Sequence, residues 1–517
     1  MILNRRSRLL LAAPPLLFLL LLSLAPLARL LQEGGQWSPG LLLDPYLQWR
    51  MLWSILQGAA TCLLALLFGV PAAWALARFH FIGRSLALRL LMLPFVMPTL
   101  VAGVGVLALF GPQGLSGLNL QDTPWLLLYG NLFFNLPLVV RAAVDGFSQV
   151  PASRLAAARS LGASRWRAFW RVEWPAALPW LLPNLCLIFL YCFSGFGLAL
   201  LLGGQRYATV EVEIYTLVAY ELNLADAGAL ALLSLLVAGG IAAVYAWLEA
   251  RLGVPARSEP LPPAPARAWS ERAWVAAALA ILLLFAGLPL LAVLWKALSA
   301  LDGLADLWDE ELRLALFNSA RFTALTVLLS GALGLCHALA AGRWLWLRAM
   351  AFLPFVVSPV CVAFGLLLLY PQWSGQLLIL LAAYVLQAYP FVAKAAGTAL
   401  DAMPAQLAQA ARSLGASPWR AFRRVIWPLL QPALRRGLAF AAATAVGEFA
   451  VTLFLSRPEW LTLTTLIYQK LGRPGQANAD AAMLLSGLLM LLATLAFIVI
   501  ESGAKRPEEL AKGDERA

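Results

Sequence analysis

The chain has 517 residues, of which 62% are hydrophobic and only 12% are charged. Soluble domains are about 45–50% apolar and about 25% charged, so a water-soluble globule could not cover this much apolar surface. The formal net charge of +12 would suggest a nucleic-acid partner in a soluble protein, but basic residues of membrane proteins collect on cytoplasmic loops. The composition therefore excludes a soluble enzyme, a disordered chain and a disulfide-stapled secreted domain.

Continuous apolar runs recur along the chain, each near the roughly 20 residues that cross ~30 Å of hydrocarbon as a helix. The predicted spans are residues 9–31, 51–76, 90–110, 125–144, 178–202, 227–248, 274–298, 312–339, 350–370, 376–400, 433–455 and 481–500. Because the runs are continuous and do not alternate, they predict helices. The predicted fold class is therefore an all-α polytopic membrane protein with about 12 transmembrane helices.

A proline-rich segment divides the chain almost in half. Five prolines lie between Gly253 and Ser270, and a segment of this kind without apolar periodicity is a semi-rigid linker. We therefore predict a first half of six spans (1–250), a linker (251–272), a second half of six spans (273–502) and a tail (503–517).

The two halves carry the same loop, 253 residues apart. Residues 159–175 read RSLGASRWRAFWRVEWP and residues 412–428 read RSLGASPWRAFRRVIWP, so only the pairs 165/418, 170/423 and 173/426 differ. We call residues 150–178 repeat loop 1 and residues 403–432 repeat loop 2. An even number of predicted spans separates them, which places both on one membrane face, as in a parallel repeat. Identity concentrated in a polar loop indicates contact with a partner.

Each repeat loop is predicted to form two short helices. A glycine, Gly162 or Gly415, has no Cβ and lets the first helix end in a sharp turn. The second helix carries an aromatic ridge with basic flanks and is expected to end at Pro175 or Pro428. Such a helix suits a groove on a soluble partner. A helix lying on anionic lipid is the alternative, although lipid does not require near-identical residues twice.

The basic residues predict the orientation of the chain. The loops richest in Lys and Arg are the N-terminal residues, the linker and alternate loops that include both repeat loops, so both termini and the repeat loops are expected in the cytoplasm. Residues 203–226 (outward loop 1) and 456–480 (outward loop 2) then face the other side and are expected to receive a binding protein. Arg29 and Arg50, near that side, are expected to snorkel to the interface.

The repeat loops resemble the EAA loop of ABC importer permeases, in which Glu-Ala-Ala-x-x-x-Gly is followed by nine residues and Ile-x-Leu-Pro. Repeat loop 1 matches this pattern from Ala156 through Gly162 to Pro175, and repeat loop 2 matches it from Gln409 through Gly415 to Pro428. The spacing from glycine to proline is kept in both loops. The leading glutamate is replaced in both, by Ala156 and Gln409.

The resemblance implies two six-helix repeats of the type I importer permease, in a bacterial inner membrane. It also implies that the loops dock into a cytoplasmic ABC ATPase dimer, which binds ATP and Mg and leaves this chain without a cofactor or catalytic residue. No Gly-Lys dipeptide occurs in the chain, so it carries no GxxxxGK[ST] phosphate loop. The residues expected to couple to the ATPase are Ala157, Ala158, Gly162, Trp166, Pro175, Ala410, Ala411, Gly415, Trp419 and Pro428.

Further segments resemble the fused permeases of thiamine importers, a family closely related to the fused ferric-iron permeases. These segments are residues 93–98 (LPFVMP), 131–137 (NLFFNLP) and 211–215 (EVEIY). The second segment favours thiamine or its phosphates, whereas the third is also close to the ferric-iron permeases. Thiamine import is the expected function, and import of ferric iron or another small solute is the alternative.

Glu448 is the candidate residue on the substrate pathway. It lies in the eleventh predicted span, where an ionised carboxylate is costly and usually faces a bundle interior or a water path. Thiamine carries a cationic thiazolium, which a carboxylate would attract. The alternative is a hydrogen-bonded residue in helix packing or gating.

Two other classes of protein remain as rivals. An ion-coupled secondary transporter can also have a parallel repeat, but it needs ionisable residues near the midplane, and these are sparse here. A membrane enzyme needs clustered His, Asp or Glu, whereas the two histidines, His80 and His337, lie far apart in the sequence. Neither histidine has a second ligand at metal spacing, so no metal site is predicted.

Overall fold

We describe the chain from a computed structural model, which covers residues 5–34, 40, 43–252, 262–304, 307–342, 344–351, 353–455 and 457–502. Helices dominate this part of the chain, and its two strands are each two residues long. The predicted all-α fold class is confirmed. The predicted tail (503–517) and linker residues 253–261 lie outside the described residues.

The chain folds into two compact units, Met1–Gly35 with Asp302–Ala517 (unit 1) and Gln36–Leu301 (unit 2). These units do not follow the sequence halves. In unit 1, α1 and α2 from the start of the chain pack on α16 and α19 of the second half, and in unit 2, α14 and α15 pack on α3 and α6 of the first half. The first span of each sequence half is therefore grouped with the later spans of the other half.

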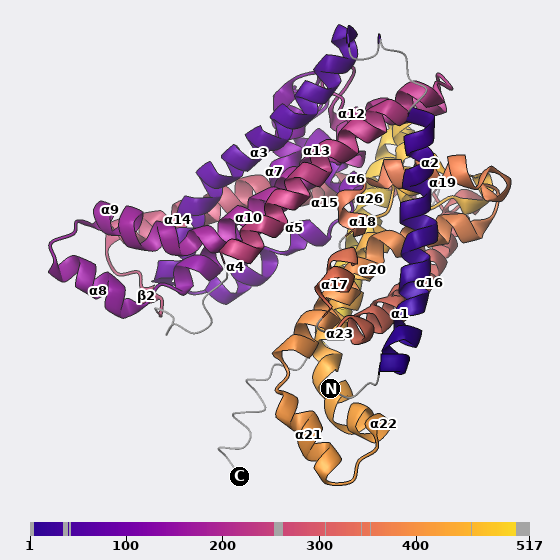
Figure 1. The fold of residues 1–517 in the computed structure, drawn as a ribbon. Helices are drawn as coiled ribbons and strands as arrows, with labels where there is room; N and C mark the ends of the chain where they lie inside the picture. The colour runs from indigo at the N-terminus through magenta and orange to yellow at the C-terminus, as the bar shows by residue number, and fades with distance from the viewer. Residues whose placement is uncertain are drawn as a thin grey trace. The chain divides into compact units, whose positions relative to one another are not determined.

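Unit 2 is a bundle built around α3, α7 and α10 (Figure 1). Its elements are α3 (Pro45–Arg78), β1 (Phe79–His80), α4 (Arg84–Leu90), α5 (Leu93–Val96), α6 (Thr99–Phe110), α7 (Pro124–Ser148), α8 (Ala152–Ser160), α9 (Arg165–Ala168), η3 (Phe169–Glu173), α10 (Trp174–Phe193), α11 (Gly197–Leu202), α12 (Val210–Ala219), α13 (Leu224–Arg251), β2 (Ala264–Pro265), α14 (Trp269–Leu282), η4 (Leu283–Gly287) and α15 (Leu288–Ser299). A Cβ at Gly69 of α3 would lie 2.9 Å from Cγ1 of Val139 in α7, so this glycine lets the two helices approach closely.

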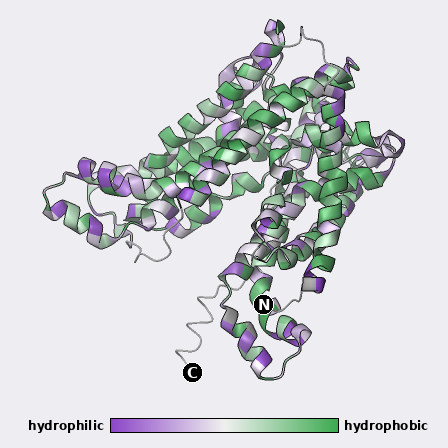
Figure 2. Cartoon of the chain, in the orientation of Figure 1, coloured by the Kyte–Doolittle hydropathy of each residue, from purple (hydrophilic) through white to green (hydrophobic). Residues whose placement is uncertain are grey.

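Unit 1 is built around α16, α20 and α23. Its elements are α1 (Arg5–Leu19), η1 (Leu20–Leu24), α2 (Ala25–Gly34), α16 (Glu310–Ala341), α17 (Leu345–Met350), α18 (Leu353–Val356), α19 (Pro359–Leu369), η6 (Pro371–Trp373), α20 (Leu377–Ala402), α21 (Ala405–Ser413), α22 (Pro418–Ala421), η7 (Phe422–Ile426), α23 (Trp427–Val446), α24 (Ala450–Phe454), η8 (Pro458–Trp460), α25 (Leu463–Gly472) and α26 (Gln476–Ser502), with η5 (Leu301–Leu304) at the boundary. Figure 2 shows apolar residues along the long helices of each unit and more hydrophilic residues on α8 and α21.

Ten of the twelve predicted spans correspond to helices in the described residues that are long and apolar enough to cross a bilayer. The third span is different, because it forms Arg84–Val96 and Thr99–Phe110, bent by 104°. The ninth is reduced to Pro359–Leu369, preceded by short helices. In both places a proline, Pro98 or Pro359, follows the helix that carries the sequence LPFV, and a proline cannot continue the hydrogen-bond ladder of that helix. The prediction of an unbroken helix at these two places is wrong.

The sequence repeat extends to the element boundaries. A shift of 253 residues maps α8, η3, α10 and α12 onto the bounds of α21, η7, α23 and α25. The ring of Phe196 lies 5.3 Å from that of Tyr215, and the rings of Phe449 and Tyr468, at the shifted positions, lie 5.2 Å apart. Each unit therefore builds the core of its repeat in the same way.

Candidate functional site

The repeat loops have the same backbone in both units. In the first, α8 ends before Gly162, whose φ is +79°, and in the second, α21 ends before Gly415, whose φ is +78°. Each glycine N–H donates to a carbonyl three residues earlier, of Arg159 or Arg412, at 2.9 Å. The left-handed conformation favours glycine, so the predicted break is found where the sequence places it.

Each repeat loop exposes a leucine and a tryptophan. Leu161 and Leu414 are 87% and 88% exposed, and Trp166 and Trp419 are 71% and 69% exposed. Both indoles stack on the phenylalanine three residues later, with ring centroids 6.2 Å apart in repeat loop 1 and 5.7 Å apart in repeat loop 2. The two leucines were missed by the sequence prediction, although their identity in both copies was a usable signal. Of the other predicted coupling residues, Ala157, Gly162, Pro175, Ala410, Gly415 and Pro428 are exposed, and Ala158 and Ala411 are half-buried.

The two prolines do not end the second helix of each loop, contrary to the prediction. Helix α9 passes through the π-helical turn η3 into α10, so that the chain is helical from Arg165 to Phe193, and repeat loop 2 continues in the same way through η7 into α23. A π turn shifts the backbone hydrogen bonds from i−4 to i−5. This shift accommodates Pro175 and Pro428, which lack the N–H donor, without ending the helix.

Repeat loop 1 is fixed to the end of α3 by a buried ion pair. Glu173 Oε2 lies 3.2 Å from Nη2 of Arg78, the last residue of α3, and accepts a hydrogen bond of 2.7 Å from Trp74 Nε1. Glu173 and Arg78 are both buried. The shifted position in repeat loop 2 is Ile426, which cannot form such a pair. Position 173/426 was noticed in the sequence only as one of three differences.

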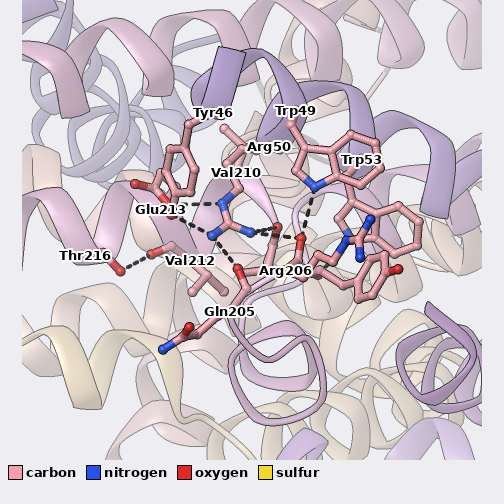
Figure 3. Close-up of polar contacts among 12 residues, drawn as sticks. Tyr46, Trp49, Arg50, Trp53, Gln205, Arg206, Val210, Val212, Glu213 and Thr216 are labelled. Atoms are coloured by element: carbon pink, nitrogen blue, oxygen red, sulfur yellow. Dashed lines mark hydrogen bonds and ion pairs between the residues drawn. The ribbon is translucent and has the colours of Figure 1, made fainter. Parts of the chain in front are cut away.

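The other end of α3 holds outward loop 1 through Arg50 (Figure 3). Arg50 is 4% exposed, and its Nε lies 3.3 Å from Oε2 of Glu213 in α12. The hydroxyl of Tyr46 donates to the same carboxylate oxygen at 2.9 Å. The prediction that Arg50 snorkels to the interface is wrong, because a buried carboxylate partner keeps its guanidinium inside the bundle.

Side chains of α3 also bind four successive backbone carbonyls of outward loop 1. Arg50 donates to the carbonyl of Gln205 at 2.6 Å and to those of residues 206 and 208 at 3.2 and 3.4 Å. Trp53 Nε1 donates to the carbonyl of Tyr207 at 2.7 Å, and Trp49 Nε1 to that of residue 206 at 3.0 Å. Because these carbonyls have side-chain donors, the loop can pack against the bundle with its polar backbone satisfied.

Outward loop 2 is held by one contact that also occurs at outward loop 1, and by other contacts of its own. Ser54 Oγ accepts from the N–H of Val210, the first residue of α12, at 2.8 Å, and Ser319 Oγ accepts from the N–H of Leu463, the first residue of α25, at 2.9 Å. These pairs correspond in the repeat. The carbonyls of residues 459 and 461 then accept from Asn318 Nδ2, each at 2.9 Å.

Ion pairs at outward loop 2 are partly exposed to solvent. Lys470 Nζ lies 3.3 Å from a carboxylate oxygen of Glu311, and Arg473 Nη2 lies 3.7 Å from the other. The position that corresponds to Glu213 is Leu466. Both outward loops nevertheless form helices whose first turns are buried, so much of each loop is packed inside its unit and is not open to a docking protein.

Glu448 stabilises the start of α24. Its Oε1 accepts from the N–H of Val451 at 2.8 Å, and its Oε2 accepts from the N–H and Oγ1 of Thr452 at 3.0 and 2.8 Å. Gln387 Nε2 lies 3.4 Å from Oε1. Both carboxylate oxygens are therefore engaged by protein groups, as in a helix N-cap. The shifted position in the first half is Gly195.

The repeat loops offer an exposed surface that includes two leucines and two tryptophans. Within the described residues, no three or more His, Cys, Asp or Glu side chains could together hold a metal ion. The exposed side chains of the repeat loops are mainly apolar and basic, and the buried acidic groups Glu173, Glu211, Glu213 and Glu448 are all engaged in hydrogen bonds. The arrangement can bind a partner and transmit a movement to the bundle.

Comparisons with known proteins place the chain among membrane transport components. A family model described as "binding-protein-dependent transport system inner membrane component" matches residues 65–254 and again residues 327–502. The thiamine transport system permease protein ThiP of Haemophilus influenzae is 28% identical over 94% of this chain and 94% of its own length. The protein of the same name from Escherichia coli is 30% identical over 89% of each chain. The molybdate/tungstate transport system permease protein WtpB of Thermococcus kodakarensis is 40% identical over 27% of this chain and 53% of its own length.

Proposed function

The chain belongs to the binding-protein-dependent transport system inner membrane component family, and from this premise we propose that it is the permease subunit of an ATP-driven importer of thiamine or thiamine phosphates. The assignment of this substrate rests on relatives named as thiamine permeases, which align over about nine-tenths of the chain. The match to the molybdate/tungstate permease spans about a quarter of the chain and does not favour that substrate.

The two repeat loops are the docking sites for an ATPase subunit on each half. One observation supports this role above all others: both loops expose the same leucine and tryptophan on the same backbone. Large apolar side chains that stay exposed in two copies fit a partner with two equivalent grooves. The chain itself supplies no nucleotide site in this proposal, and ATP and Mg bind to the partner.

The proposed orientation follows from the basic loops. The repeat loops, the linker and both termini lie in the cytoplasm, and the outward loops meet a substrate-loaded binding protein in the periplasm. Closure of the ATPase dimer draws the repeat loops together and tilts the helices between inward-open and outward-open states.

Co-purification tests the docking role. We expect the full chain to bring down an ATPase subunit. A variant with Trp166→Ala and Trp419→Ala should lose the ATPase, because it lacks both of the indoles that fill the grooves of the ATPase in this proposal. Trp308→Ala is the matched control, since Trp308 is also exposed but lies outside the repeat loops. Retention of the ATPase by the double variant would contradict docking through these residues.

Uptake into proteoliposomes tests the function as a whole. We expect labelled thiamine to accumulate only with ATP, the ATPase and thiamine-loaded binding protein present, and ferric iron supplied in the same way not to accumulate. Thiamine uptake driven by an ion gradient without the ATPase would contradict the proposal. The pathway role predicted for Glu448 is tested by Glu448→Gln in the same assay, where an unchanged rate and affinity would remove it.

A further inference from the structure

Helix α3 carries a buried arginine near each of its ends. Arg50 pairs with Glu213 of outward loop 1, and Arg78 pairs with Glu173 of repeat loop 1. Arg78 follows Arg50 by 28 positions, a rise of about 42 Å at 1.5 Å per residue, which exceeds the ~30 Å of a hydrocarbon core. One helix therefore connects the loops at the two ends of unit 2 through ion pairs that are both buried.

The second half holds α16 to outward loop 2 by other contacts and has no carboxylate at the two positions that matter here. The positions that correspond to Glu173 and Glu213 are Ile426 and Leu466. Aligning α16 on α3 by the shared serine contact, Ser54 with Ser319, places Ala315 at the position of Arg50. Neither end of α16 can therefore reproduce the ion pairs of α3 at these positions.

The packing of α3 favours its movement as one body. It is helical from Pro45 to Arg78, with Pro71 inside the helix, and it packs against α7, α10, α12 and α14 of the same unit. Packed interiors resist compression and transmit displacement, and the four carbonyl contacts to residues 205–208 attach outward loop 1 to the same helix. Repeat loop 1 and outward loop 1 are thus both attached to α3, at its opposite ends.

We propose that α3 is the mechanical link by which a loaded binding protein at outward loop 1 raises ATP hydrolysis at repeat loop 1, and that this signal travels mainly through the first half. Glu173 and Glu213 are positioning residues in this link. The inference rests on the proposed function and deepens it, because it assigns the two halves unequal parts in regulating the ATPase.

The test replaces each ion pair by apolar residues, and the two glutamates take the side chains found at the corresponding positions of the second half. The inner variant is Arg78→Met with Glu173→Ile, the outer variant is Arg50→Met with Glu213→Leu, and the combined variant carries all four changes. Replacing a buried ion pair by apolar residues of similar volume is often neutral for stability, although Arg50→Met also removes the donor to the carbonyls of Gln205 and Ala208. The readout is ATP hydrolysis by the reconstituted complex, without and with thiamine-loaded binding protein.

We expect stimulation by the binding protein, measured against each variant's own basal hydrolysis, to fall about fivefold in each variant, the low end of typical coupling between sites. The combined variant should fall no further, because either change already interrupts the same link. The free-energy effects of changes at distant, independent sites usually add, so two independent fivefold losses would multiply to about 25-fold. A combined loss of that size would overturn the proposal. Unchanged stimulation in both single-pair variants would overturn it as well.

A matched control lies in the second half. Arg348 and Asp401 form an exposed ion pair there, and Arg348→Gln with Asp401→Asn should leave stimulation unchanged, whereas an equal fall would contradict a route through the first half. If the combined variant fails to assemble, Glu173→Gln and Glu213→Gln carry the same additivity test, because the amide oxygen can still accept from Trp74 or Tyr46. Absence of ATP hydrolysis in the wild-type complex would instead contradict the proposed function.

Discussion

The two halves of the chain present the same glycine turn, leucine and tryptophan but hold them in different ways. Repeat loops 1 and 2 share their glycine turn, their exposed leucine and their stacked tryptophan. The contacts behind them differ, since Glu173 forms a buried ion pair with Arg78 where the second half has Ile426. The difference teaches that the same turn, leucine and tryptophan can be held on different supporting contacts.

The same contrast holds at the outward loops. In unit 2, α3 and α12 are joined by a buried pair, Arg50 with Glu213, and in unit 1, α16 and α25 are joined by the more exposed pairs of Lys470 and Arg473 with Glu311. Breaking a buried pair leaves an unpaired charge in a low dielectric, whereas water and salt compensate an exposed one. Four predictions would break or sharpen this comparison.

The largest effect is expected for Glu213→Ala in unit 2. The change leaves Arg50 buried without its carboxylate, which costs about 3 kcal/mol of unfolding free energy. Glu311→Ala, the matched change in unit 1, should cost less than about 1 kcal/mol. Chemical unfolding of the purified chain in detergent measures both. Equal losses would show that the two outward loops are held with the same strength.

Next comes Glu448→Ala, which removes the acceptors at the start of α24. Two buried N–H groups, of Val451 and Thr452, would lose their partner, and we expect a loss of about 2 kcal/mol. Glu448→Gln should lose less, because its amide oxygen can still accept. The same unfolding assay applies, and a loss below that of an exposed-site control such as Glu311→Ala would contradict the capping role.

A smaller and equal effect is expected for Gly162→Ala and Gly415→Ala. Their φ angles are +79° and +78°, and no neighbouring atom lies within 4 Å of the place that a Cβ would take at either glycine. The cost is therefore that of the left-handed backbone alone, about 1 kcal/mol each. Unequal losses would show that the surroundings of the two turns differ. Unfolding of the isolated chain separates this cost from any effect on partner binding.

The smallest effect is expected for Asp401→Asn. Asp401 pairs with Arg348 at an exposed position, and such pairs are worth about 0.5 kcal/mol and are screened by salt. The loss should disappear at about 1 M salt, where the Debye length is about 3 Å. The Glu213→Ala loss should persist at the same salt concentration, and its disappearance would contradict the assignment of that pair as buried.

Local sequence predicted most of the fold. The length of the continuous apolar runs located ten of the twelve spans, and the glycine at 162 or 415 located the turn in each repeat loop. Both features could be predicted because they depend on residues that are neighbours in the sequence. The broken third span was missed because LPFVMP is as apolar as an unbroken helix, and the bend depends on where the chain can pack after Pro98. The continuation through Pro175 was missed because a π turn leaves no periodic mark in the sequence.

The charged residues show most clearly what local sequence could not predict. Arg50 looked like an interfacial residue, because its partner Glu213 lies 163 residues away in the sequence and no local pattern joins them. Glu173 was visible as a difference between the copies, but its contact with Arg78 depends on α3 ending beside repeat loop 1. Glu448 was identified as costly to bury, and only its neighbours reveal that it caps α24.

The sequence by itself determined that the chain lies in a membrane, that it is made of helices, and that it presents one loop twice. These follow from composition and from repetition, which need no knowledge of distant contacts. The tertiary structure alone decided that the first span of each half packs in the unit of the other half, and that α3 joins two loops through buried ion pairs. Both features depend on which segments meet in space. Burial removes the water that screens a charge, so a buried charge needs a partner that only the tertiary structure supplies.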